Sequence, residues 1–138
     1  MSLNFKKSKV KYNNTKVEYD GIKFDSKREK DRYILLKQAE KDGKIENLVV
    51  HPKFELVPAV KEKVVKHLKT KDKEIEKTVQ LAITYTADFM YDKNGEIVIE
   101  DVKIGKHLLP KEYVLKKKMM LAIMHLRVKE VYKPNEEI

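Results

Sequence analysis

Two aspartates and a lysine stand in a spacing that suits metal and phosphate chemistry: Asp88, Asp101 and Lys103 in the stretch "ITYTADFMYDKNGEIVIEDVK". Between the aspartates lies Asn94-Gly95, a dipeptide that strongly favours a two-residue β-hairpin loop. Such a loop places Asp88 directly opposite Asp101, with Cβ atoms about 4.5–5.5 Å apart. Because side chains of a strand alternate, Lys103 shares the face of Asp101. The pattern therefore predicts one hairpin face with two carboxylates and an ammonium group.

Two carboxylates that converge on one point repel each other unless a cation lies between them. Hard oxygen ligands suit Mg²⁺, which binds through one or two carboxylates and keeps water molecules for a phosphate group. A four-residue loop over 92–95 would instead make the aspartates diagonal neighbours about 7 Å apart, still within reach of one ion. The alternative is an ordinary surface ladder in which Asp101 pairs with Lys103 and Asp88 is solvated. The pattern alone leaves both open.

Two acids stand side by side in "EIVIEDVK", and successive side chains of a strand point to opposite faces. One of the two, Glu100 or Asp101, should therefore face something other than bulk water. Glu100 shares a face with Val98 and Val102, so we expect it to point away from the aspartate pair.

A helix is predicted over "SKREKDRYILLKQAEKDG", residues 26–43. Ser26 is a natural N-cap and Glu29 follows three residues later, which is the S-x-x-E capping box. Gly43 ends the helix as its C′ residue. The capping role accounts for Glu29 without any catalysis. The apolar face of this helix consists of Tyr33, Leu36 and Ala39, with Leu35 beside them.

The remaining segments predict a mixed α+β layer in which helices flank a central sheet. An N-terminal β-hairpin is expected over "KVEYDGIKF", and two short strands follow on either side of Pro52. The charged segment 59–77 fits either a hairpin excursion or a short helix. Residues 79–91 are predicted as one strong strand, in which Val79, Leu81, Ile83 and Tyr85 alternate with polar or small residues, and "LRVKEVY" is predicted as the last strand. A second helix begins with Pro110 at its first position.

The composition indicates one globular domain with a strong positive charge. The chain has 138 residues, no cysteine and a formal net charge of +9. The lack of cysteine excludes disulfides, thiol nucleophiles and thiolate zinc sites. No apolar stretch approaches the roughly 20 residues of a membrane span and no secretory signal opens the chain, so we expect a cytoplasmic protein with no membrane partner. A flexible basic arm is expected over 1–15 and a single domain over 16–138.

The lysines are clustered along the chain. Residues 1–12 hold four lysines and no acid, and residues 103–118 hold six lysines and one acid. Clusters of this kind are typical of a surface that follows nucleic-acid phosphates, so we expect a polyanionic partner. Solubility alone is the alternative explanation.

Other chemistry finds little support in the sequence. The four histidines have no metal-ligand spacing, and His51 is interpreted as a structural residue at a strand end. His107 lies near the acidic hairpin, where it could touch a phosphate. No G-x-S-x-G, Walker or G-x-G-x-x-G motif is present, which argues against serine hydrolases, P-loop ATPases and Rossmann enzymes.

Taken in order, "GIKFDSKREKDRYILLKQAEKDGKIENLVVHPKFELVP" and "ITYTADFMYDKNGEIVIEDVK" resemble a phage and prophage domain family within the PD-(D/E)XK nuclease superfamily. The resemblance spans about residues 12–132. It implies a restriction-endonuclease-like αβββαβ core. It also implies a helix acid at Glu29, a strand acid at Asp88, and an acid-x-Lys pair at Asp101 and Lys103.

By the same resemblance, Mg²⁺ or Mn²⁺ would be held by Asp88, Asp101 and the backbone carbonyl of Val102, with Glu29 on a metal-bound water or a second ion. Lys103 would orient the attacking water. The DNA-binding residues would be Lys106, Lys111, Tyr113, Lys116, Lys117 and Lys118.

The activity implied is a divalent-metal-dependent DNA endonuclease, phage-encoded and acting as a homodimer on branched DNA such as Holliday junctions. The alternative is a catalytically inactive DNA-binding protein on the same fold, because Ile104 stands where the family often has glycine and the 61–77 segment is rich in lysine. A structural protein with coincidental acids is a third hypothesis, which predicts no metal binding.

Overall fold

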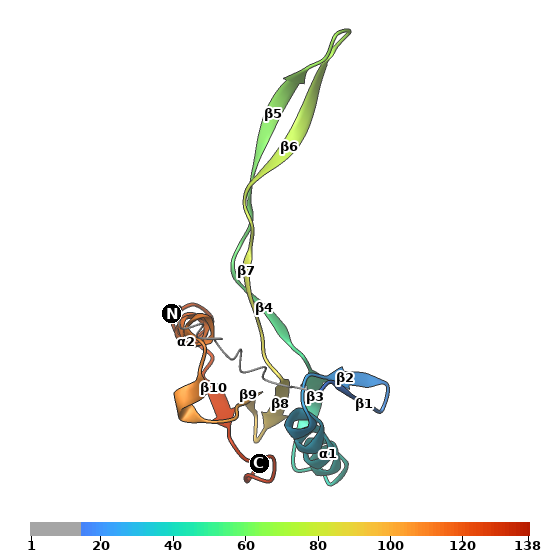
Figure 1. The fold of residues 1–138 in the computed structure, drawn as a ribbon, viewed down its shortest axis with the longest axis vertical. Helices are drawn as coiled ribbons and strands as arrows, with labels where there is room; N and C mark the ends of the chain where they lie inside the picture. The colour runs from blue at the N-terminus through green and yellow to red at the C-terminus, as the bar shows by residue number, and fades with distance from the viewer. Residues whose placement is uncertain (1–14) are drawn as a thin grey trace, which may run out of the picture.

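The computed structural model describes residues 15–138 and has a mixed α+β fold (Figure 1). The basic arm expected over 1–15 lies almost wholly outside the described residues. The elements are β1 (Val17–Tyr19), β2 (Ile22–Phe24), α1 (Lys27–Lys41), β3 (Glu46–Val50), β4 (Lys53–Val57), β5 (Val60–His67), β6 (Asp72–Gln80), β7 (Ile83–Thr86), β8 (Phe89–Lys93), β9 (Glu96–Val102), η1 (Lys106–Leu108), α2 (Lys111–Met119), η2 (Met120–Met124) and β10 (Val128–Val131).

The central sheet has the strand order β10-β9-β8-β3. Strand β8 is antiparallel to both β3 and β9, whereas β10 is parallel to β9. The predicted two-residue loop between β8 and β9 is confirmed, because Lys93 pairs with Glu96 and Phe89 pairs with Glu100. Asn94 and Gly95 have φ angles of 51° and 80°, as a type I′ turn requires.

Each face of the sheet carries its own apolar cluster. On one face α1 packs against β8 through Tyr33, Leu36 and Ala39, which confirms the predicted helix face. Leu35 is exposed instead. On the other face Met120 and Tyr113 pack against Ile99. The helices therefore flank the sheet, with one apolar cluster on each of its faces.

Helix α1 begins as its sequence predicts. The hydroxyl of Ser26 accepts the backbone N–H of Glu29 at 3.2 Å. The other half of the capping box differs, because the Glu29 carboxylate accepts the N–H of Asp25 rather than that of Ser26. Gly43 has a φ of 73° directly after the C-cap, as a C′ glycine does.

Glu100 points to the α1 face, away from Asp101, as predicted. It is fully buried and forms two hydrogen bonds with Arg32, at 2.8 and 2.5 Å. The Tyr91 hydroxyl donates to the same carboxylate. Both acids of the adjacent pair are therefore removed from bulk water, since Asp101 is buried as well.

The strand predicted over 79–91 is wrong as one element. Residues in this stretch belong to β6, β7 and β8, which are interrupted at 81–82 and 87–88. Leu81 is 78% exposed, so its alternation with Val79 and Ile83 does not mark a buried face. The undecided segment 59–77 lies mainly in the β5–β6 hairpin, which projects far from the rest of the molecule (Figure 1).

The second helix starts one residue later than predicted. Pro110 is the N-cap rather than the first helical residue, and α2 passes into the π-helical turn η2. His125 then ends the helix in the left-handed conformation, with a φ of 57°. No helix between residues 15 and 138 is long and apolar enough to cross a membrane.

Candidate metal centre

An open cleft of about 1160 Å³ lies between the start of α1, the end of β7, the end of β9 and the start of α2. All five residues that the resemblance implies as metal-binding or catalytic line it: Glu29, Asp88, Asp101, Val102 and Lys103. They come from three parts of the chain that are distant in sequence. The fold therefore brings the predicted carboxylates and the lysine to one surface.

Asp88 stands immediately before β8, one residue beyond the last regular pair of the hairpin, Phe89 with Glu100, so the predicted direct pairing of Asp88 with Asp101 is not formed. Its backbone N–H donates to the carbonyl of Glu100 at 3.1 Å. Its carboxylate accepts the backbone N–H of Val102 at 2.7 Å. This second bond fixes the Asp88 carboxylate across the end of β9, on the cleft side beside Asp101.

Asp101 is held from two sides. Lys103 Nζ lies 3.0 Å from Asp101 Oδ1, and the Tyr85 hydroxyl donates to Oδ2 at 2.5 Å. The ammonium group of Lys103 also lies 3.7 Å from the centre of the Tyr113 ring, in a cation–π contact. These contacts orient the lysine without burying it fully.

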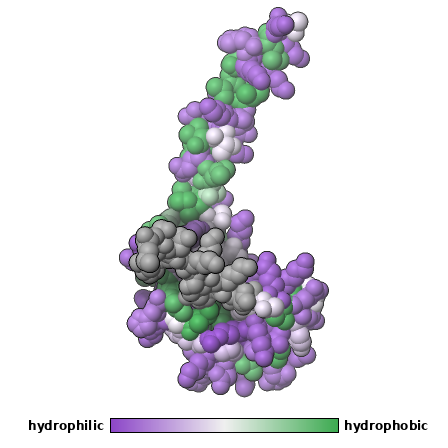
Figure 2. All heavy atoms as spheres, viewed as in Figure 1, coloured by the Kyte–Doolittle hydropathy of each residue, from purple (hydrophilic) through white to green (hydrophobic). Residues whose placement is uncertain are grey.

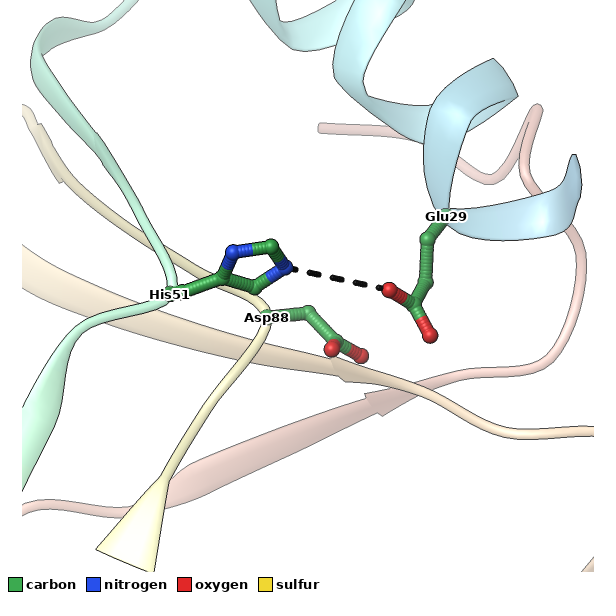
Figure 3. Close-up of side chains that lie close together, drawn as sticks. All are labelled: Glu29, His51 and Asp88. Atoms are coloured by element: carbon green, nitrogen blue, oxygen red, sulfur yellow. Dashed lines mark ion pairs between the residues drawn. The ribbon is translucent and has the colours of Figure 1, made fainter. Parts of the chain in front are cut away.

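Glu29, Asp88 and His51 form a compact group of possible metal ligands (Figure 3). One ligand atom from each residue lies within 4.8 Å of the others. His51 Nε2 is 4.0 Å from Glu29 Oε2. The interpretation of His51 as only a structural strand-end residue therefore missed its position beside two acids.

The local backbone explains how His51 reaches the acids. It lies between β3 and β4 with a φ of 53°, and its N–H donates to the carbonyl of Asp88 at 2.9 Å. This positive φ occurs although Pro52 follows, a residue that usually favours extended backbone at the preceding position. No motif spacing signals this arrangement, because it depends on pairing across the sheet.

Two acids of the cleft, Glu29 and Asp88, hold protons more tightly than free carboxyl groups do. Burial, with the negative charges of Asp25 and Asp101, raises the pKa of Glu29 to about 7. Burial and the neighbouring charges of Asp101 and Glu29 also raise the pKa of Asp88. Carboxylates that repel one another in this way suit a divalent cation, which would neutralise them.

Tyr85 is a second residue that the sequence did not single out for the site. The sequence indicates only a place in the apolar alternation of a strand, and the Tyr85 ring is indeed buried. Its hydroxyl, however, contacts Asp101, and burial followed by the charge of Asp101 raises the pKa of the phenol. Tyr85 therefore remains a neutral hydrogen-bond donor to the carboxylate.

The predicted DNA-binding residues fall into two groups. Tyr113 and Lys116 line the cleft, although the Tyr113 hydroxyl donates to Glu130 and Lys116 pairs with Glu112 at 2.8 Å. Lys117 pairs with Glu130 at 3.2 Å and is not part of the lining. The residues outside the lining that are also exposed are Lys106, Lys111 and Lys118.

A family model described as "Protein of unknown function (DUF1064)" matches residues 9–134. The matched range contains every residue of the cleft named above. No curated protein matches the chain. No solved structure matches it either.

Proposed function

We propose that this chain, which belongs to the DUF1064 family, is a divalent-metal-dependent DNA endonuclease that hydrolyses phosphodiester bonds. The observation that carries the proposal is the meeting of Glu29, Asp88 and Asp101 beside Lys103 in one open cleft. Phage-encoded action on branched DNA, such as Holliday junctions, belongs to the same proposal. It rests on the resemblance to the PD-(D/E)XK superfamily.

The order of elements supports this resemblance. From α1 onward, the sheet and its flanking helices follow the order α1, β3, β8, β9, α2 and β10, with the projecting strands inserted between β3 and β8. This is the αβββαβ order that the resemblance implies. Glu29 on α1, with Asp101 and Lys103 at the end of β9, are the residues that we propose to be the helix acid and the acid-x-Lys pair of that order.

The donor set fits a divalent cation. Asp88, Asp101 and Glu29, with the Val102 carbonyl, would hold Mg²⁺ or Mn²⁺ through oxygen atoms. His51 adds an imidazole nitrogen beside them, and this nitrogen favours Mn²⁺ over Mg²⁺ because Mg²⁺ is a hard ion that prefers oxygen ligands. When bound, such an ion stabilises negative charge on phosphate oxygens and makes a bound water more acidic.

Lys103 is proposed to orient the attacking water and to stabilise the charge that develops on the phosphate. The carboxylate of Asp101 and the ring of Tyr113 hold its ammonium group at the edge of the cleft. Tyr85 holds Asp101 in turn. The lysines of α2, with Lys106 of η1 before it, would contact the DNA backbone. Two copies of the chain would cut the two strands of the DNA.

A catalytically inactive DNA-binding protein is the second candidate, and one observation favours it. Ile104 lines the cleft with 48% of its surface exposed, at the position where the related motif often has glycine. A side chain there narrows the approach to Lys103. This candidate predicts salt-sensitive DNA binding without cleavage in any divalent metal.

The proposal is tested by incubating the protein with duplex, flap, single-stranded and four-way DNA in Mg²⁺ or Mn²⁺. We expect metal-dependent cleavage that EDTA abolishes. The Asp101→Asn variant should fold, bind DNA and fail to cut. Absence of cleavage on all four substrates in both metals would instead support the inactive DNA-binding protein.

A further inference from the structure

The β5–β6 hairpin, residues 60–80, projects from the body as a two-stranded ribbon (Figure 1). We call it the projecting hairpin. Every one of its residues is exposed, including Val64 and Ile75, which face each other across the strands. A two-stranded hairpin without a packed face is only marginally stable in water. Its length and exposure therefore indicate a surface made for a partner.

The two faces of the projecting hairpin differ in charge. Between 61 and 78 the pairing is regular, so alternate residues share a face. One face carries three lysines and one acid: Glu62, Val64, Lys66, Lys73, Ile75 and Lys77. The other face carries two lysines and three acids: Lys61, Lys63, Val65, His67, Asp72, Glu74, Glu76 and Thr78. Only the first face, called here the basic face, has a clear excess of positive charge.

The strongest sign of a polyanionic partner is near the tip. Lys66 and Lys73 are direct cross-strand partners, and like charges placed opposite each other destabilise a hairpin. Lys69 and Lys71 continue the cluster into the turn, so residues 66–73 hold four lysines and one acid. On the opposite face the charges are matched instead, since Lys63 pairs with Glu74 and His67 with Asp72. Anions bound at the tip would relieve the repulsion.

We propose that the basic face of the projecting hairpin binds the phosphates of duplex DNA, with the ribbon lying in the major groove. The inference takes DNA as the partner from the proposed function. The major groove of B-form DNA, about 12 Å wide, admits a two-stranded β-ribbon. The deep and narrow major groove of double-stranded RNA does not. The proposed partner is therefore a DNA duplex.

The position of the hairpin suits a duplex that also enters the cleft. Strand β7 connects the hairpin to Asp88 and itself contributes Tyr85 and Thr86 to the cleft lining. The strands from 53 to 67 span roughly 50 Å at about 3.3 Å per residue. That length corresponds to about 15 base pairs at 3.4 Å each. The space-filling view shows hydrophilic and apolar residues interspersed along the extended arm that the projecting hairpin forms with β4 and β7 (Figure 2).

The first experiment removes the projecting hairpin. Val60 pairs with Gln80, so replacing residues 61–79 by an Asn-Gly turn closes the strands with a two-residue loop. The replaced residues bury nothing, so the body should keep the thermal unfolding of the full chain. Affinity for a 30-base-pair duplex is measured in EDTA, where no cleavage can occur. We expect a loss of about tenfold or more, and an unchanged affinity would overturn the proposal.

A matched pair of variants tests the basic face in the full-length chain. Lys66→Gln with Lys73→Gln removes two charges from the basic face. Lys61→Gln with Lys63→Gln removes two charges from the other face. The first pair should lower the slope of log affinity against log salt by about 1.8, since each phosphate contact contributes about 0.9. If the two double variants lower this salt slope by the same amount, the basic face is not the surface that binds the phosphates.

Two further measurements separate this inference from its alternatives. Binding to double-stranded RNA of the same length should be equally weak with and without the projecting hairpin. A second copy of the chain is the competing occupant. If removing the hairpin converts a dimer to a monomer in light scattering while DNA affinity stays the same, the inference is wrong. Cleavage by the wild type is measured in a separate assay. If the protein does not cut DNA, the proposed nuclease function fails, and the binding measurements in EDTA still test the role of the projecting hairpin.

Discussion

Neighbouring residues of β9 have opposite environments because the pleat of a strand sends them to opposite faces. Glu100 enters the interior and pairs with Arg32, whereas Asp101 faces the cleft and contacts Lys103. One carboxylate therefore stabilises the fold and the next is available for chemistry. Each of the two carboxylates has a cation beside it, as buried charges require.

At the residue scale, the first prediction concerns Lys103. Lys103→Ala should lower the cleavage rate by about 100-fold or more, because one well-placed donor to a developing negative charge contributes about that much. DNA affinity in EDTA should change little. Lys116→Ala is the matched control, since it removes the same charge from the same cleft. If both variants lose the same fraction of the cleavage rate, Lys103 contributes only positive charge for DNA binding and has no separate role in the chemical step.

The second prediction concerns His51 and the choice of metal. His51→Ala should weaken Mn²⁺ binding more than Mg²⁺ binding, because Mg²⁺ is a hard ion that prefers oxygen ligands and gains little from an imidazole nitrogen. Isothermal titration with each metal measures this directly, without any substrate. His107→Ala, another single histidine loss, serves as the control. If the ratio of the two affinities does not change in His51→Ala, His51 is not a ligand.

The sequence predicts the cleft residues that lie on regular elements. Asp88, Asp101 and Lys103 follow from the hairpin register, and Glu29 follows from the cap of a helix. His51 and Tyr85 could not be found in the same way. His51 reaches the site through an irregular backbone with positive φ, and Tyr85 has a buried ring whose hydroxyl alone belongs to the site.

At the element scale, α1 joins the core and the cleft. Its first turn carries Glu29 to the cleft, and its second turn carries Arg32 to Glu100 on β9. Arg32 also donates to the carbonyls of Pro134 and Glu136, which ties the C-terminal residues to the helix. The buried pair therefore fixes the distance between the helix acid and the strand acids.

The third prediction tests this buried pair. Arg32→Met alone should destabilise the protein by about 3–5 kcal/mol, because it leaves the Glu100 carboxylate buried without its cation. Adding Glu100→Met should recover most of that loss, since an apolar pair needs no charge compensation. Urea unfolding measures both. Glu74→Gln, which breaks an exposed pair, should change stability by less than about 1 kcal/mol. A single variant as stable as the wild type would contradict the role of the pair.

The elements that the sequence predicted well are those with a buried face. Helix α1, the β8–β9 hairpin and β10 each have apolar positions that pack in the core. The strand predicted over 79–91 failed because its alternation starts in the projecting hairpin and the residue after it, and there Val79 and Leu81 pack against no core. Periodicity reports which side chains could share a face, and it does not report whether anything covers that face.

At the scale of the whole molecule, the body and the projecting hairpin have different physical roles. The body holds two apolar clusters and an acidic group at a cleft. The hairpin has no buried residue and carries lysines toward its tip. The net charge of +9 is therefore combined with a local concentration of negative charge, which suits a protein that binds a polyanion and a cation together.

The last prediction concerns the stability of the metal-free protein as pH rises. Glu29 has a pKa of about 7 in the folded chain against an ordinary 4.5. The folded state therefore binds this proton more tightly than the unfolded state does. The contribution of this proton to the free energy of unfolding is fully present below pH 4.5 and is lost as the pH rises through 7. The loss amounts to about 3 kcal/mol at 1.36 kcal/mol per pKa unit, and Asp88 adds to it in the same direction.

Urea unfolding in EDTA should therefore show the free energy of unfolding falling between pH 5 and pH 8. Glu29→Gln should flatten this fall, because an amide has no proton to lose. Glu112→Gln, an exposed glutamate of the same cleft, should leave the slope as it is. Mn²⁺ should restore more stability at pH 8 than at pH 5, since its ligands must be deprotonated. If Glu29→Gln keeps the full slope, or if Mn²⁺ stabilises equally at both pH values, these acids do not form a common cation site.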